Sequence, residues 1–212
     1  RDGKGVTELN EPGAPLSGKA MEDFFALAKE EAARSEYVVL TGSLPPGCPD
    51  NTYGELIRAM GGTRCILDAG GPVLRLGVEA GPFLLKPNLA ELEQALGAQL
   101  RTLGAIRDAA LIFLRKGASH VVVSMGAMGA MYVSEARTLY APALRVEARS
   151  TVGAGDAMVG GMLLGLQKSG DMAQAFRYGI AAGAASVMTE GTQLIHPEDF
   201  ERLVSQVKVQ EV

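Results

Sequence analysis

Short runs of apolar, often β-branched residues recur along the chain, separated by longer segments with helical periodicity. Apolar runs without polar alternation are typical of strands buried on both faces of a sheet. They predict strands at Tyr37–Gly42, Arg64–Ala69, Phe83–Asn88 and His120–Gly126. Two further segments, Gly129–Ser134 and Thr138–Ala143, predict a hairpin that turns at Glu135–Arg137.

The segments between these strands carry apolar residues at helical spacing. The clearest stripes are Met21, Phe24, Phe25, Ala28 and Ala32; Leu103–Leu114; Phe176, Ile180, Ala184, Val187 and Met188; and, after a start at Pro197, Phe200, Leu203, Val204 and Val207. Alternating strands and helices predict an α/β fold with a doubly wound, mostly parallel sheet flanked by helices. The 212 residues contain no repeat or linker, so residues 1–212 are expected to form one domain.

The predicted strands end in segments rich in Gly, Pro, Ser and polar residues, namely TGSLPPG, DAGG, LKPNLAEL and SMGAMG. Ligands of open α/β sheets bind at the carboxyl ends of the strands. The segments with the most chemistry therefore lie where this fold is expected to bind its ligand.

The composition removes several function classes. A formal net charge of −4 argues against a general nucleic-acid binder, but it leaves room for a phosphate ligand held by backbone N–H groups. Two cysteines outside any CxxC pair and only two histidines argue against zinc and favour reduced thiols. No run of 18 apolar residues and no leader pattern is present, so no membrane partner and a cytoplasmic location are expected.

The segment STVGAGDAMVGGML, Ser150 to Leu163, places one carboxylate after Gly-Ala-Gly and before an apolar run. The apolar run predicts a buried helix, whose N-terminus would offer free N–H groups to an anion. Asp156 in its first turn has two interpretations. It either favours the helix dipole, or it accepts a proton from an alcohol while the N–H groups stabilise a transferring phosphoryl group.

The segment KPNLAEL, Lys86 to Leu92, also has two interpretations. Asn88 and Glu91 have the spacing of an N-terminal capping box. The alternative is that they organise Mg²⁺ and its water shell beside a triphosphate.

Three further segments are open to similar pairs of interpretations. Gly126 and Gly129 form either a simple turn or a close approach to a flat ligand. Ser43 belongs either to a rigid Pro-Pro turn or to a phosphate contact. The small residues around Ala184 allow either close helix packing or an adenine ring. Neither a G-x-G-x-x-G fingerprint nor a Walker A loop is present.

Taken together and in this order, these segments resemble the ribokinase-like sugar kinases of the phosphofructokinase-B family. STVGAGDAMVGGML resembles the C-terminal signature of that family, and KPNLAEL, VVVSMGAMGA and TGSLPPG match its other motifs in order. The segments SLPPG and VTELNEPG are most similar to those of the sugar-phosphate branch, which includes 6-phosphofructokinase of the minor type, 1-phosphofructokinase and tagatose-6-phosphate kinase. The run AAGAASVMTEGTQL favours the first of these.

The resemblance implies ATP and Mg²⁺ as cofactors and a role for each matching residue. Asp156 would be the catalytic base on the sugar hydroxyl, beside an anion hole formed by Gly153, Ala154 and Gly155. The ATP phosphates and Mg²⁺, the latter held indirectly, would lie at Lys86, Asn88 and Glu91. The adenosine side would be bound by Ser124, Gly126, Gly129 and Ala184. The sugar phosphate would contact Ser43 and Asp156.

The family also holds a monovalent cation, such as K⁺, near the anion hole. The matching positions are Ser150, Val152, Ser186, Thr189, Gly191 and Gln193. Backbone oxygens could serve at Ser150, Val152 and Ser186 whatever the side chain. Thr189 and Gln193 depart from the family pattern, in which Asn and Arg are common.

One departure concerns the start of the chain. Family members begin with roughly another hundred residues that carry an N-terminal signature, a β-rich lid and most of the sugar-binding side chains. The chain begins at RDGKGVTELNEPG, which resembles the connection from lid to core, so the N-terminal strands and the lid are expected to be missing. The full-length protein is expected to be a homodimer.

The expected activity is phosphorylation of fructose 6-phosphate by ATP, with fructose 1-phosphate or tagatose 6-phosphate as alternative acceptors. A nucleotide-binding protein without catalysis is the competing hypothesis, because most of the sugar-binding residues of the family have no counterpart here.

Overall fold

The computed structural model describes residue 11 and residues 13–212. Most of the segment VTELNEPG, on which part of the resemblance rests, lies outside the described residues. The elements alternate as the sequence predicts. The helices are α1 (Gly18–Ala32), α2 (Thr52–Ala59), α3 (Gly71–Gly77), α4 (Leu89–Leu96), α5 (Leu103–Arg115), α6 (Ala154–Ser169), α7 (Met172–Ser186) and α8 (Pro197–Gln206). The strands are β1 (Tyr37–Thr41), β2 (Arg64–Asp68), β3 (Leu84–Leu85), β4 (His120–Ser124), β5 (Ala130–Val133), β6 (Thr138–Ala141) and β7 (Gln210–Glu211). Short 3₁₀ turns occur at Val78–Ala80 and Gly126–Met128.

The seven described strands form one sheet in the order β1-β2-β3-β4-β5-β6-β7. Strands β1 to β4 run parallel, and β5, β6 and β7 continue the sheet in antiparallel fashion. The predicted hairpin is therefore present as β5 and β6. Because β1 to β4 are parallel, their carboxyl ends meet at one edge of the sheet, which brings the polar segments together.

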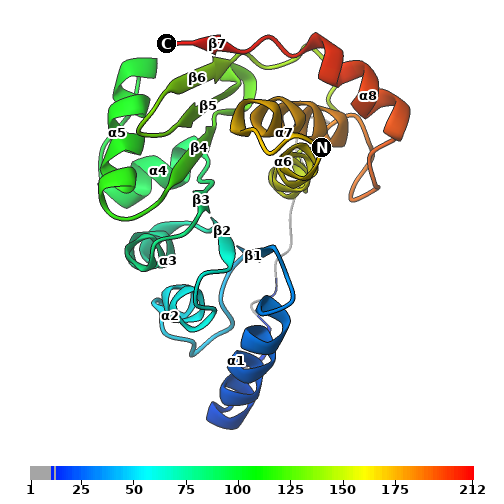
Figure 1. Cartoon of the computed structure of the whole chain (residues 1–212). Coiled ribbons are helices and arrows are strands. Elements are labelled where there is room, and N and C mark those ends of the chain that lie inside the picture. Colours follow the sequence, from blue (N-terminus) through cyan, green and yellow to red (C-terminus); the bar gives the residue numbers. More distant parts are fainter. Residues whose placement is uncertain (1–10, 12) are drawn as a thin grey trace, which may run out of the picture.

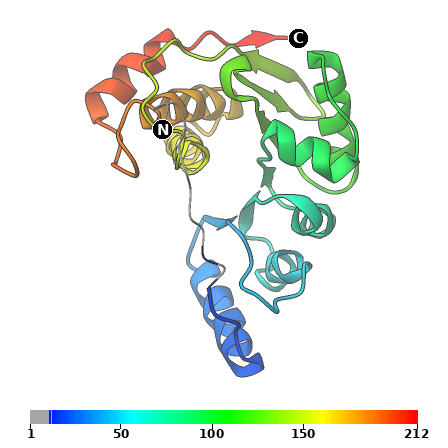
Figure 2. The same ribbon diagram turned by 180° about the vertical axis from the view of Figure 1, so that it is seen from behind.

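Helices cover both faces of the sheet (Figures 1 and 2). One apolar core lies between the sheet and helices α2 to α5, and it contains Leu67, Leu85, Val121 and Phe113. The other core lies between the sheet and helices α6 to α8, and it contains Ile66, Val122, Met162 and Phe176. The alternation of adjacent strand residues between the two cores explains why the strands are apolar throughout. The expected α/β fold class is confirmed.

Strand β3 is shorter than the sequence predicts. The ladder ends at Leu85, because Pro87 has no backbone N–H to donate. The chain nevertheless stays beside its neighbours. The Lys86 N–H donates to the Leu67 carbonyl at 2.9 Å, the Ser124 N–H donates to the Pro87 carbonyl at 3.1 Å, and Asn88 forms an isolated bridge with Ser124. Lys86 and Asn88 thus remain at the carboxyl edge of the sheet.

The sequence predicts that the apolar stripe of α1 is buried, but the stripe is only partly buried. Ala32 is buried, whereas Phe25 and Ala28 are half-buried and Phe24 is 48% exposed. Helix α1 extends away from the rest of the described chain (Figure 1), and it contacts a core through Phe25, Ala28 and Ala32. Helix α6 shows the opposite behaviour: it is buried against the sheet and α7, as its apolar sequence predicts.

Candidate active site

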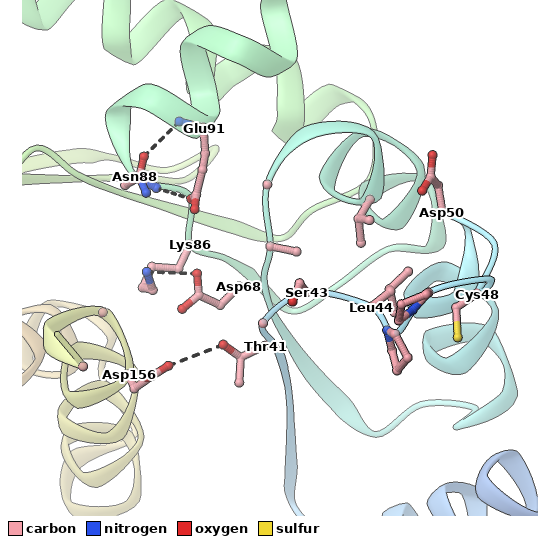
Figure 3. Close-up of a pocket in the computed structure, with 18 of the residues that line it drawn as sticks. Thr41, Ser43, Leu44, Cys48, Asp50, Asp68, Lys86, Asn88, Glu91 and Asp156 are labelled. Carbon is pink, nitrogen blue, oxygen red and sulfur yellow. Dashed lines mark hydrogen bonds and ion pairs between the residues drawn. The ribbon is translucent and has the colours of Figure 1, made fainter. Parts of the chain in front are cut away.

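A cavity of about 710 Å³ opens at the carboxyl edge of the parallel strands. It is lined by the loop after β1, by the ends of β2 and β3, by the start of α4 and by the first turn of α6 (Figure 3). These elements are far apart in the sequence, and the parallel register brings them together. The cavity is polar, and its lining includes Thr41, Ser43, Asp68, Lys86, Asn88, Glu91, Gly153, Gly155 and Asp156.

Asp156 lies in the first turn of α6, and its carboxylate reaches into this cavity. The helix begins after Gly153, which has a positive φ of 77° that favours glycine. The Thr41 hydroxyl donates to Oδ1 of Asp156 over 3.4 Å, a long contact that orients the carboxylate but leaves its second oxygen open (Figure 3). Asp156 is therefore an exposed carboxylate beside N–H groups that have no acceptor within the helix.

The expected anion hole is divided between cavities. Gly153 and Gly155 line the polar cavity, whereas Ala154 lines a neighbouring one. The Ala154 N–H also turns back to the Thr151 carbonyl at 3.4 Å. The geometry therefore leaves the Gly155 and Asp156 amides, rather than the Ala154 amide, as the donors best placed for an anion in the polar cavity.

A buried ion pair closes the floor of the cavity. Nζ of Lys86, which is 3% exposed, lies 3.0 Å from Oδ1 of Asp68. Burial raises the pKa of Asp68, and the neighbouring Lys86 ammonium opposes this rise. The carboxylates of Glu91 and Asp156 add to the rise, because like charges disfavour a further negative charge.

Asn88 and Glu91 form the capping box that their spacing predicts. The Asn88 side chain accepts from the Glu91 N–H at 2.9 Å, and Oε2 of Glu91 accepts from the Asn88 N–H at 2.7 Å. Both side chains also line the polar cavity, and Oε1 of Glu91 is not used by the box. The capping interpretation is confirmed, and it leaves one carboxylate oxygen available to a water or an ion.

These residues fit a water-rich Mg²⁺ site. Among the described residues, no three His, Cys, Asp or Glu side chains converge on one point as in a site built from protein ligands alone. Magnesium usually keeps several waters and is shared between one or two carboxylates and substrate phosphates. Glu91 and Asp68 supply carboxylates of this kind on one side of the cavity.

A second, mainly apolar cavity of about 570 Å³ adjoins the first. Asn88 and Gly155 line both cavities, so the two meet between the start of α4 and the first turn of α6. The residues expected on the adenosine side all line the second cavity, namely Ser124, Gly126, Gly129 and Ala184. The apolar walls come mainly from α7 and from the segment after β6.

The two glycines of SMGAMG differ in their reason for being glycine. A Cβ on Gly129 would collide with the backbone of Ala141 and Ala143, so the chain itself requires glycine there. A Cβ on Gly126 would meet nothing within 4 Å, although its φ of 56° also favours glycine. The turn interpretation is sufficient for Gly129, and Gly126 is the position that leaves open space in the cavity.

The segments expected to hold a monovalent cation lie side by side. The Arg149 and Ser150 N–H groups donate to the Val187 carbonyl at the end of α7. The Thr189 hydroxyl lies 2.8 Å from the Ser186 carbonyl and 3.1 Å from the Gln193 carbonyl. Val152, Ser186 and Gln193 line a common cavity of about 530 Å³, and Gly191 has a φ of 59° in the turn between them. A group of carbonyl and hydroxyl oxygens fits a hard cation.

The sequence-based set of site residues omits Asp68, which pairs with Lys86, and Thr41, which donates to Asp156; both line the polar cavity. Asp68 stands in the segment DAGG, where nothing local distinguishes it from a residue of a turn. The available signal is a pair of charged residues, Asp68 and Lys86, that end two successive parallel strands and so become neighbours. Thr41 has the same position at the end of β1.

Comparison with known proteins agrees with this arrangement. A family model described as pfkB family carbohydrate kinase matches residues 2–199. The chain therefore belongs to the pfkB family of carbohydrate kinases.

The described residues contain no helix long and apolar enough to cross a membrane.

Individual relatives are phosphofructokinases. The chain is 37% identical over 207 residues to a protein named 1-phosphofructokinase from Rhodobacter capsulatus, which covers 96% of the chain and 66% of that protein. It is 36% identical over 199 residues to ATP-dependent 6-phosphofructokinase isozyme 2 of Escherichia coli (strain K12), which covers 91% of the chain and 63% of that protein. The chain thus spans just under two thirds of the length of these two relatives.

A solved structure shows the same fold. The crystal structure of phosphofructokinase-2 from Escherichia coli in complex with potassium superposes with a TM-score of 0.84 at 33% identity, over 93% of the chain and 65% of that protein.

Proposed function

We propose that the chain carries the active site of an ATP-dependent sugar-phosphate kinase, with fructose 6-phosphate as the first candidate acceptor. The observation that supports the proposal most strongly is the meeting of two unlike cavities at Asn88 and Gly155. The apolar cavity has the walls that a purine ring needs, and the polar cavity holds the carboxylate, the ammonium and the helix N-terminus. A triphosphate that crosses between them would bring its terminal phosphorus to the first turn of α6.

In this mechanism Asp156 is the general base. Its carboxylate accepts the proton of the acceptor hydroxyl while that oxygen forms a bond to the γ-phosphorus and the bond to the β-phosphate oxygen breaks. The Gly155 and Asp156 amides stabilise charge on the transferring group, because they are fixed donors at a helix N-terminus. Lys86 supplies a positive charge from the cavity floor. When bound, Mg²⁺ would neutralise charge on the β- and γ-phosphates, with Glu91 and Asn88 ordering its water.

The relatives support more than one acceptor. The names 1-phosphofructokinase and 6-phosphofructokinase belong to relatives of nearly equal identity, 37% and 36%. Both acceptors carry a phosphate and a free primary hydroxyl, so the same base and the same anion site serve either one. Ser43 lines the polar cavity and does not line the apolar one, and it is the proposed contact for the phosphate of the acceptor.

The proposal is tested by incubating the chain with Mg-ATP and each of fructose 6-phosphate, fructose 1-phosphate and tagatose 6-phosphate. ADP release is followed by a coupled assay, and Mg-ATP binding is followed by calorimetry on the same samples. The proposal expects ADP release that depends on one acceptor. Binding of Mg-ATP without acceptor-dependent ADP release would favour a nucleotide-binding protein that lacks catalysis.

A further inference from the structure

The loop that follows β1 supplies more of the lining of the polar cavity than any other segment. It runs from Thr41 to Asp50, and it includes Ser43, the proposed contact for the phosphate of the acceptor. The apolar cavity, in contrast, is lined by other segments of the described chain. In the proposed site this loop therefore belongs to the side of the acceptor and not to the side of the purine.

The start of this loop is exposed and has few contacts that fix it. The backbone leaves β1 at Gly42, which has a φ of 87°, and a Cβ there would meet nothing within 4 Å. The N–H groups of Gly42, Ser43 and Leu44 make no hydrogen bond to the rest of the described chain. The side chain of Leu44 packs against the core, but the residues before it need another anchor.

The hydroxyl of Tyr53 is that anchor. It donates to the Thr41 carbonyl at 2.7 Å and lies 3.3 Å from the Gly42 carbonyl. Tyr53 stands in the first turn of α2, and its side chain is 9% exposed within the core that α2 shares with the sheet. Packing therefore fixes the ring, and the ring fixes the hydroxyl. Burial also raises the pKa of Tyr53, so the hydroxyl keeps its proton and remains a donor.

Two polar side chains of the site depend on the backbone that Tyr53 holds. Thr41 and Ser43 adjoin the bonded carbonyls, and both line the polar cavity (Figure 3). The Thr41 hydroxyl donates to Oδ1 of Asp156 over 3.4 Å, which is already close to the limit for a hydrogen bond. A small displacement of the end of β1 would therefore break this contact and would move Ser43 as well.

We propose that Tyr53 is a positioning residue, whose hydroxyl holds the start of the β1 loop so that Thr41 and Ser43 meet the base and the acceptor. This inference rests on the proposed function, since it assigns Tyr53 to the acceptor side of the same site. Tyr53 does not line the cavity and touches no reacting atom in this role. The substitution Tyr53→Phe keeps the ring in the core and removes only the hydroxyl, so it releases the loop while α2 stays packed.

The first test measures steady-state rates of ADP formation with varied acceptor, beginning with fructose 6-phosphate, and with varied Mg-ATP. Tyr53→Phe is expected to lower kcat/KM for the acceptor by roughly tenfold, the rate equivalent of one lost hydrogen bond, and to leave KM for Mg-ATP nearly unchanged. Tyr132→Phe is the matched control. It removes the hydroxyl of another buried tyrosine, which shares a 2.9 Å hydrogen bond with His120, and Tyr132 lines neither cavity of the proposed site.

Tyr132→Phe is expected to leave both kinetic values unchanged, which separates positioning from a general loss of stability. Three kinetic results would overturn the inference. One is an unchanged kcat/KM for the acceptor in Tyr53→Phe. Another is an equal loss in the two variants. The third is a rise in KM for Mg-ATP as large as the rise for the acceptor.

The second test needs no turnover and uses ¹⁵N relaxation of the backbone amides of Gly42 and Ser43 in the chain without ligands. Their order parameters are expected near about 0.85 in the unsubstituted chain and in Tyr132→Phe, and below about 0.6 in Tyr53→Phe. Low values in the unsubstituted chain would overturn the inference even if Tyr53→Phe does not fold, and so would unchanged values in Tyr53→Phe. An unsubstituted chain that forms no ADP with any acceptor would refute the proposed function, and the order parameters would then decide alone whether Tyr53 holds the loop.

Discussion

Helices α6 and α7 pack so closely that position 161 of α6 requires glycine, whereas the neighbouring position 160, which does not face α7, does not. A Cβ on Gly161 would lie 2.6 Å from Cβ of Ala182 and 2.6 Å from the Tyr178 carbonyl oxygen, both in α7. Ordinary contacts begin at 3.4 Å, so the two helices would have to separate locally by roughly 0.8 Å, the difference between 3.4 and 2.6. Gly160 is exposed, and a Cβ there would meet nothing within 4 Å.

The two substitutions to alanine are therefore expected to have opposite signs. Each gains about 0.5–1 kcal/mol because alanine loses less backbone entropy in a helix than glycine does. Gly161→Ala also adds an overlap in a packed interface, which costs about 1–3 kcal/mol. The net expectation is a loss of up to about 2.5 kcal/mol in unfolding free energy for Gly161→Ala and a gain of about 0.5–1 kcal/mol for Gly160→Ala.

Urea denaturation followed by circular dichroism measures both effects. Because the two positions are neighbours in one helix, the pair controls for helix propensity and for any change in the unfolded chain. A Gly161→Ala variant that is as stable as Gly160→Ala, or more stable, would refute the close packing of α6 on α7.

Two further predictions concern the pH dependence of stability. Asp171 is the N-cap of α7, and the hydrogen bond from the Gln174 N–H, with a smaller effect of Arg137, lowers the pKa of its carboxyl. The ionised carboxylate therefore stabilises the folded chain above the ordinary aspartate pKa, and this stabilisation is lost as the pH falls through the lowered pKa. Urea denaturation of Asp171→Ala should show an unfolding free energy lower by about 1 kcal/mol at neutral pH and a smaller loss in acid, whereas Asp171→Asn should retain most of the cap. An equal loss for Asp171→Ala at both pH values would contradict this prediction. His120 packs on Phe83 and shares a hydrogen bond with Tyr132, and burial lowers the pKa of its ring. The folded state therefore prefers the neutral ring, and the chain loses stability as the pH falls below about 6.5, the ordinary histidine pKa. His120→Gln should reduce this loss between about pH 5 and 6.5, and an unchanged slope would contradict the assignment.

The fold could be predicted from the sequence because the buried strands are apolar on both faces and α1, α5, α7 and α8 carry apolar residues at helical spacing. The exceptions have physical reasons. Strand β3 ends early because Pro87 cannot donate to the ladder. Helix α1 extends away from the rest of the described chain (Figure 1), so Phe24 stays 48% exposed although Phe25 and Ala32 of the same stripe reach a core. Short-range patterns report what one segment prefers, whereas burial depends on what the rest of the chain supplies.

The candidate site could be predicted in part. Asp156, Lys86, Asn88 and Glu91 stand in distinctive segments, and the structure brings all four to one cavity. Asp68 was missed, because its significance depends on Lys86 on the adjacent strand and not on its own neighbours in the sequence. The absence of Ala154 from the lining of the polar cavity, which Gly153 and Gly155 do line, was also beyond sequence reasoning, since it depends on which way each residue of the α6 turn faces.

The most direct test of the central claim is the rate of acceptor-dependent ADP formation in Asp156→Asn compared with Asp199→Asn. Both variants remove an acid from the first turn of a helix, but Asp199 lies in α8, where its carboxylate pairs with Arg202. A general base contributes about 10²–10⁴-fold, so Asp156→Asn should lower turnover by at least about a hundredfold with Mg-ATP binding nearly intact, while Asp199→Asn leaves turnover unchanged. Unchanged turnover in Asp156→Asn would contradict the role of Asp156 as the base in phosphoryl transfer.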